Sequence, residues 1–459
     1  MTRDLTKGSP AKLIVFFTLP LLIGNVFQQF YNMADTFIVG RTIGPDALAA
    51  VGCTGSIMFF IIGFAQGITS GLSIVISQRF GAGDEEGVRR SFATSTLICI
   101  VTTVVLTAIS VVLTRPILEL MQTPSDIIDD AYSYLVVIFA GIGASILFNF
   151  LSNVIRALGD SRTPLIFLVI ASGLNVILDF VLIVYGHMGV AGAGVATVIA
   201  QVVSGLLCIV YIVKRFPILH IRRSDWRQSK EQIYLHLRLG LPMGFQASII
   251  SIGTISVQIA LNTLGTTSVA AYTAASKIDN LCTMPSQSFG VAMATYTAQN
   301  YGANLMDRIR VGVRRCCVIS GVVSALLGVM NILFGKYLVE LFVGADGTAE
   351  IVSLAQIMLT MNGICYVFLA LLFIYRSTLQ GIGKSFIPTV SGVIELVIRI
   401  FAAFVLVAVM GFTGACLANC MAWVGACIFL CITYYITMHK LFRRPAYEIP
   451  KPVNQENRE

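Results

Sequence analysis

The sequence is poor in charged residues: Asp, Glu, Lys and Arg make up 12% of its 459 residues, against about 25% in an ordinary soluble domain. Hydrophobic residues reach 56%. A soluble chain of this length would be expected to form about three domains. The shortage of charge excludes that organisation and indicates an integral membrane protein that crosses the bilayer many times.

Histidine is scarce, and the spacings that mark metal sites or active sites are missing. The four histidines are His187, His220, His236 and His439, which lie at expected loops or at the ends of apolar runs. Most of the eleven cysteines fall within apolar runs, so we interpret them as small buried hydrophobes. The sequence contains no Ser-His-Asp set and no Gly-rich phosphate loop. We therefore expect neither an enzyme nor a resident cofactor.

The net charge of +8 does not indicate a nucleic-acid partner, because the basic residues form short clusters between apolar runs. The N-terminus, the C-terminal tail and the connections after even-numbered runs hold 26 of the 31 Lys and Arg residues. The opposite connections hold only Arg41, Arg115 and Lys336. Both termini are therefore expected in the cytoplasm. The first run is too long for a cleavable signal, and we expect it to be retained as a span.

Twelve apolar runs are long enough, at about 20 residues, to cross a bilayer. They are Leu13 to Ile38, Leu48 to Ile68, Phe92 to Leu113, Tyr132 to Leu151, Pro164 to Tyr185, Val190 to Val213, Gly240 to Leu261, Val269 to Ala292, Val313 to Phe334, Ser353 to Ile374, Phe386 to Met410 and Thr413 to Met438. The predicted fold class is an all-α integral membrane protein with twelve transmembrane helices.

The two halves of the chain resemble each other. The motif at 188–196, Met-Gly-Val-Ala-Gly-Ala-Gly-Val-Ala, returns at 410–418 as Met-Gly-Phe-Thr-Gly-Ala-Cys-Leu-Ala. Gln-Arg-Phe-Gly-Ala at 78–82 returns as Gln-Asn-Tyr-Gly-Ala at 299–303. Similar echoes in the same order indicate a duplicated six-helix unit. We expect an N-lobe at 1–213, a basic cytoplasmic linker at 214–239, a C-lobe at 240–438 and a cytoplasmic tail at 439–459.

An even number of helices in each unit makes the repeat parallel, an architecture used by transporters that rock one bundle against the other. Pro20 and Pro242 lie near the start of the first helix of each half. Proline removes a backbone hydrogen bond and permits a bend, so both are candidate hinges. A static kink is the alternative for each.

Asn175 and Asp179 interrupt the fifth apolar run and lie four residues apart, on one face of a helix. An ionisable group at membrane depth costs about 2.5 to 3.5 kcal/mol, so it normally faces the bundle interior and marks an ion path. Counting the rise per residue, we expect Asp35 of the first run and Thr197 of the sixth at matching depth.

Two carboxylates that share a low-dielectric site cannot both remain ionised, so they suit a shared proton or a monovalent cation such as Na⁺. The predicted cation and proton site is therefore Asp35, Asn175, Asp179 and Thr197. The alternative is that the two acids are hydrogen-bonded groups with structural roles.

Further polar residues inside the runs are candidates for a substrate cavity or for gating. In the first run these are Gln28, Tyr31 and Asn32. In the second half they are Lys277 and Asp279 of the eighth run and Glu395 and Arg399 of the eleventh. Glu395 precedes Arg399 by four residues, the spacing of an intrahelical ion pair. Structural pairing remains the alternative for the four residues of the second half.

Taken together, these features resemble the multidrug and toxic compound extrusion (MATE) family. The resemblance rests on Pro20, Gln28 and Asp35, and on the motifs at 46–52, 78–82, 156–160, 175–179 and 192–197, in this order. It implies a secondary antiporter that expels cationic or amphipathic small molecules in exchange for protons or sodium, with Asp35, Asn175, Asp179 and Thr197 as its cation site. It also implies a bacterial cytoplasmic membrane location, and we expect a monomer.

The seventh run, Gly240 to Leu261, lacks the glutamate found in the NorM-like branch, which favours the DinF-like bacterial branch. A flippase for a lipid-linked saccharide on the same scaffold is the alternative function. The absence of arginine from the first two runs argues against it, because a cavity for pyrophosphate is expected to be basic.

Overall fold

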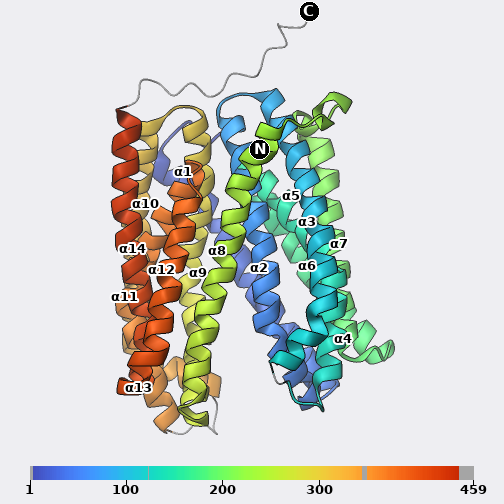
Figure 1. Cartoon of the computed structure of the whole chain (residues 1–459), viewed down its shortest axis with the longest axis vertical. Helices are drawn as coiled ribbons and strands as arrows, with labels where there is room; N and C mark the ends of the chain where they lie inside the picture. The colour runs from blue at the N-terminus through green and yellow to red at the C-terminus, as the bar shows by residue number, and fades with distance from the viewer. Residues whose placement is uncertain (1–3, 122, 344–348, 444–459) are drawn as a thin grey trace, which may run out of the picture. The chain divides into compact units, whose positions relative to one another are not determined.

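The computed structural model describes residues 4–121, 123–343 and 349–443, which are almost entirely helical and contain no β-strand (Figure 1). The helices of the first half are α1 (Pro10–Thr42), α2 (Pro45–Gly81), α3 (Glu85–Leu120), α4 (Ile128–Ala140), α5 (Ile142–Ala157), α6 (Arg162–Phe180) and α7 (Gly189–Arg215). Those of the second half are α8 (Lys230–Asn262), α9 (Thr266–Gly302), α10 (Met306–Val343), α11 (Ala349–Gly381), α12 (Phe386–Phe401), α13 (Val407–Met410) and α14 (Phe412–Phe442).

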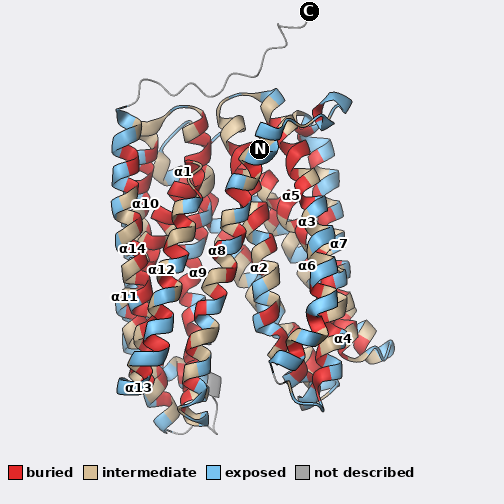
Figure 2. Cartoon of the chain, viewed as in Figure 1, coloured by how far each residue is buried: buried red, intermediate tan, exposed pale blue. Residues whose placement is uncertain are grey.

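Each of the twelve apolar runs lies in one helix or in consecutive helices, which confirms the all-α architecture with twelve spans. Within the described residues, ten single helices are long and apolar enough to cross a bilayer, and the pair α4 and α5 adds an eleventh. The remaining run lies in α9, which is more polar and contains Lys277 and Asp279. Large apolar side chains such as Val112, Phe386 and Leu341 are exposed on the helices, as expected for faces that contact lipid (Figure 2).

The fourth span differs from the continuous helix expected over Tyr132 to Leu151. It breaks at Gly141, where α4 and α5 meet at an angle of 47°. A Cβ atom at this position would lie 2.3 Å from Val198 Cγ2 of α7. The break therefore coincides with a close approach of α7 that only glycine permits.

The duplication seen in the sequence is present in the backbone. Gly189 and Gly411, which belong to the repeated Met-Gly motif, have φ angles of 58° and 57°. Gly159 and Gly383 both have a φ of 91°. These left-handed conformations strongly favour glycine, which explains why both copies keep it. One π-helical turn also recurs, at Val181–Tyr185 after α6 and at Ala402–Leu406 after α12.

The chain divides into two compact units. The first comprises Leu19–Ser73 and Arg89–Ser251, and the second comprises Ile74–Val88 with the described residues of 3–18 and 252–459. Helices α1, α2, α3 and α8 therefore each contribute to both units. Pro20 and Pro242 both lie in the first unit, and Pro20 is the second residue of α1 after the division between the units. The lobe boundaries expected from chain order, and the hinge roles of the two prolines, remain predictions.

The basic linker is shorter and more structured than the expected 214–239, because α7 continues to Arg215 and α8 begins at Lys230. Two short 3₁₀ turns, Pro217–Leu219 and Arg223–Trp226, lie between these helices. Asp225 is buried and forms an ion pair with Arg89 at the start of α3, with 3.5 Å between Nε and Oδ2. The expected tail at 439–459 is described only as far as residue 443.

In the second unit, α10 and α11 approach closely at two glycines. A Cβ atom on Gly328 would lie 2.3 Å from the carbonyl oxygen of Gly363. Small residues are common where membrane helices meet, because they allow the backbones to approach. This contact fixes how α10 and α11 pack.

We predict that Gly328→Val destabilises the protein by about 1–3 kcal/mol, the usual cost of inserting methyl groups into a packed interface. The thermal unfolding midpoint in detergent measures this effect. Gly321→Val is the matched control on the same helix, because a Cβ there meets nothing within 4 Å. Equal midpoints for the two variants would contradict the proposed role of the contact.

Candidate ion-binding site

The polar pair of α6 is buried in the first unit. Asn175 is 1% exposed and Asp179 is 0% exposed, although many of their apolar neighbours on the helix remain exposed. Their spacing of four residues places both side chains on the same face. The sequence therefore turns the polar face of α6 inward and leaves apolar side chains on its outer face.

Asp35 of α1 meets this pair. It is 9% exposed, and its carboxyl group lies close enough to that of Asp179 for the two to share a hydrogen bond. A hydrogen bond between two carboxyl groups requires a proton on at least one of them, because an ionised carboxylate can only accept. The geometry thus fits a pair that holds a shared proton.

Asn175 and Thr197 complete the polar group. In the amide orientation that gives both its oxygen and its nitrogen a partner, Asn175 donates to Asp179 Oδ2 at 3.1 Å and accepts from the backbone N–H of Thr197 at 3.2 Å. Tyr31 of α1 lies close enough to the Thr197 side chain to form a hydrogen bond with it. The structure therefore brings together all four residues of the predicted cation site and one of the predicted cavity residues.

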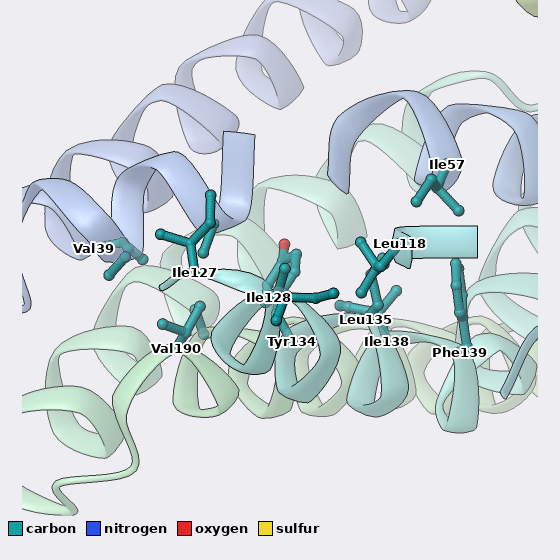
Figure 3. Packing of buried hydrophobic residues seen from close by; sticks show 14 of the residues in the cluster. Val39, Ile57, Leu118, Ile127, Ile128, Tyr134, Leu135, Ile138, Phe139 and Val190 are labelled. Carbon is teal, nitrogen blue, oxygen red and sulfur yellow. The ribbon is translucent and has the colours of Figure 1, made fainter. Parts of the chain in front are cut away.

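Tyr134 of α4 is a further neighbour that the sequence reasoning missed. It is 4% exposed and lies close enough to Asp35, Asp179 and Tyr31 to interact with them electrostatically. Its ring belongs to an apolar cluster that includes Val39, Leu135 and Val190 (Figure 3). Through Tyr134, the carboxyl pair therefore lies beside this apolar cluster.

One oxygen of each acid lacks a partner. Asp35 Oδ1 and Asp179 Oδ1 are buried and accept no hydrogen bond from the described residues. An unsatisfied buried oxygen costs about 1–3 kcal/mol, and more when the group is charged. Two such unpartnered carboxyl oxygens are suited to accept a proton or a hard monovalent cation.

The other cavity candidates of α1 are placed differently. Gln28 and Asn32 are exposed, and neither forms a hydrogen bond with the carboxyl pair among the described contacts. Tyr31 is therefore the only one of the three with an observed contact to the site, and the roles of Gln28 and Asn32 remain predictions.

In the second unit, Lys277 and Asp279 do not form a pair. Lys277 is exposed, whereas Asp279 is buried and accepts hydrogen bonds from Tyr366 Oη at 2.7 Å and Asn362 Nδ2 at 2.9 Å. Two residues apart on a helix, the side chains of 277 and 279 point to different faces. Asp279 is thus held by neutral donors from α11, not by the nearby lysine.

Glu395 and Arg399 of α12 form the expected intrahelical ion pair, with 3.3 Å between Glu395 Oε2 and Arg399 Nη1. Glu395 also forms an ion pair with Arg376 of α11, and all three side chains are buried. The sequence reasoning missed Arg376, because it follows the predicted end of the tenth run and was counted with a basic connection. The helix α11 continues past it to Gly381.

The fold and this polar core define an integral membrane transporter built from two six-helix repeats. The MatE family profile matches residues 20–181 and again residues 242–405. The two matches begin 222 residues apart, in agreement with the repeat, and together they cover most of the chain. The chain therefore belongs to the MatE family of transporters and is not an enzyme.

Similarity extends over nearly the full length of relatives. The chain is 30% identical to the probable multidrug resistance protein YoeA of Bacillus subtilis, over 88% of this chain and 89% of that one. It is 26% identical to the probable multidrug resistance protein NorM of Thermotoga maritima, over 86% and 85%. A multidrug resistance MATE family transporter solved in an outward-facing conformation superposes with a TM-score of 0.90 at 25% identity, over 96% and 98%.

We predict that Glu395→Ala destabilises the protein by about 3–5 kcal/mol, since it leaves two buried arginines without their shared counter-charge. Thermal unfolding in detergent is the measurement. The control is Glu119→Ala, which removes a carboxylate that is 61% exposed from its pair with Arg115. Exposed pairs contribute little, so this variant should unfold like the parent. A parent-like midpoint for Glu395→Ala would refute the structural role of the triad.

Proposed function

We propose that the protein is a cation-coupled antiporter that exports cationic or amphipathic small molecules in exchange for H⁺ or Na⁺. The relatives named above are described as multidrug resistance proteins, which supports this substrate class. The single observation that carries the coupling is the buried carboxyl pair, Asp35 and Asp179, with one unpartnered oxygen on each.

The chemistry of coupling follows from the repulsion between the two acids. When the shared proton leaves, two carboxylates face each other in a site that excludes water, and their repulsion is strong. A returning proton, or a sodium ion held by Asp35, Asp179, Asn175 and Thr197, relieves that repulsion. The occupancy of the site therefore changes how strongly α1 is attracted to α6.

Helix α1 is the element through which this change acts. It contributes Tyr31 and Asp35 to the site, and its beginning, before Leu19, belongs to the second unit. A ligand shifts a conformational equilibrium only by its different affinity for the two states. We propose that proton or cation binding favours the state in which α1 lies against α6, and that cargo binding favours the other.

The site lies in a bilayer-spanning part of the chain, and the bacterial relatives suggest the cytoplasmic membrane as its location. We propose that one copy of the chain suffices for transport, because every described residue of the site comes from a single unit of one chain.

We predict that Asp179→Asn abolishes ion-driven export. The amide keeps the size of the side chain but cannot be ionised, so it removes the charge change on which coupling depends. Transport of a fluorescent cationic dye in inverted vesicles should fall by at least about tenfold, a factor within the usual range of coupling between two ligands. Asp126→Asn, which alters an exposed loop acid, should transport like the parent.

Ion-dependent transport by Asp179→Asn at the parental rate would overturn the coupling mechanism. Asp35→Asn provides an independent second variant, and size-exclusion chromatography confirms that each variant is folded. Loss of transport in Asp126→Asn as well would show that the assay reports expression and not coupling.

A second prediction concerns the driving ion. A proton gradient and a sodium gradient are imposed in separate experiments on proteoliposomes that contain the protein. One of the two gradients should drive uptake of the dye. The effective gradient should lose its effect in Asp35→Asn, because both ions use the same oxygens. Dye uptake that needs neither gradient would exclude coupled exchange.

A further inference from the structure

The repeated Gln-x-x-Gly motif, which the ion site does not use, brings the ends of α2 and α9 together in the second unit. A Cβ atom on Gly81 would lie 2.0 Å from the carbonyl oxygen of Gln299, and one on Gly302 would lie 1.8 Å from the carbonyl oxygen of Gln78. Each motif thus presents its glycine to the glutamine backbone of the other. No other residue type fits at either glycine without separating the two helix ends.

Polar contacts surround this reciprocal packing. Gln78 Nε2 donates to the carbonyl of Gly381 at 2.7 Å, and Ser77 Oγ donates to the carbonyl of Thr295 at 3.4 Å. Ser77 is only 2% exposed. The contact therefore consists of backbone packing and a few hydrogen bonds, which can separate at modest cost because each hydrogen bond contributes about 1 kcal/mol.

The N-terminal segment at residues 4–8 forms hydrogen bonds with the motif of α9 in this contact. The backbone N–H of Leu5 donates to Gln299 Oε1 at 2.9 Å, and its carbonyl accepts from Asn300 Nδ2 at 3.2 Å. The Leu5 side chain is 1% exposed. Gln299 thus contacts Gly81 through its backbone and the N-terminal segment through its side chain.

Arg308 of α10 also forms hydrogen bonds with this segment. Its guanidinium donates to the carbonyl of Gly8 at 3.0 Å and to that of Leu5 at 3.3 Å, while its Nε donates to Asn300 Oδ1 at 3.0 Å. Five hydrogen bonds therefore join residues 5 and 8 and the motif at 299–302 into one assembly. Such density of contacts is unusual for the start of a chain, which is generally poorly ordered unless it is tied down.

We propose that residues 4–8 act as a strap that locks the contact between the two motifs, and that release of the strap permits the ends of α2 and α9 to separate during the transport cycle. This proposal rests on the proposed alternating-access function. The strap directly precedes α1, whose first residues belong to the second unit and which also carries Asp35.

The test uses Ser77→Cys in the full chain as a reporter. A membrane-impermeant maleimide is applied to the face that carries the N-terminus, and labelling of the parent with its native cysteines is subtracted. Leu5→Asp and Arg308→Gln should each raise the labelling rate on the order of tenfold, because the first disrupts the buried Leu5 side chain and the second removes hydrogen bonds of the strap. Lys7→Gln, at a side chain that is 85% exposed, should leave the rate unchanged.

Gly81→Val forces the ends of α2 and α9 apart. Its labelling rate is therefore the reference for helix ends that are separated. Gly55→Val is its control on α2, since a Cβ there meets nothing within 4 Å. Parental labelling in both strap variants, with fast labelling in Gly81→Val, would overturn the strap. Parental labelling in Gly81→Val as well would overturn the closed contact itself.

The assay is independent of ion coupling. Labelling as expected, together with dye transport that needs no ion gradient, would overturn the proposed antiport and leave the strap standing. Size-exclusion chromatography identifies a variant that fails to fold, and the second strap variant then decides the outcome.

Discussion

The structure depends on one electrostatic constraint: two carboxyl groups are buried side by side within membrane-spanning helices. Each costs several kcal/mol at that depth unless it is neutralised or hydrogen-bonded. Asp35 and Asp179 meet this constraint by lying close enough to share a proton, and Asp179 also contacts Asn175, which in turn contacts Thr197. The oxygens that remain without partners are the atoms at which we propose that a proton or a cation binds. This proposal links stability and function at the same atoms.

The second unit handles buried charge in another way. Glu395 lies between Arg376 and Arg399, so its ionic group is paired within the protein. Asp279 is surrounded by neutral donors, Tyr366 and Asn362. The duplication has thus preserved the backbone turns at Gly189 and Gly411 while the polar side chains of the two halves have diverged. The two halves therefore share backbone features but stabilise their buried charged groups in different ways.

Much of the fold was predictable, because a bilayer requires apolar runs of a fixed length and a polar side chain in such a run is costly. The same rule singled out Asp35, Asn175 and Asp179, and the rise per residue placed Thr197 at their depth. Tyr134 was missed because tyrosine is common in membrane helices and gives no such signal. Arg376 was missed because its helix extends beyond the apolar run. The break at Gly141 depends on a contact with Val198, which is distant in sequence.

By itself, the sequence determined the number of spans, the duplication and the residues that must avoid lipid, because these follow from local composition and from the cost of burying charge. Only the tertiary structure decided which of those residues meet. It joined Asp35 to Asp179, separated Lys277 from Asp279, and placed Leu5 beside Gln299. Such pairings depend on how distant helices pack, and packing is set by the shapes of many side chains at once and not by any one segment.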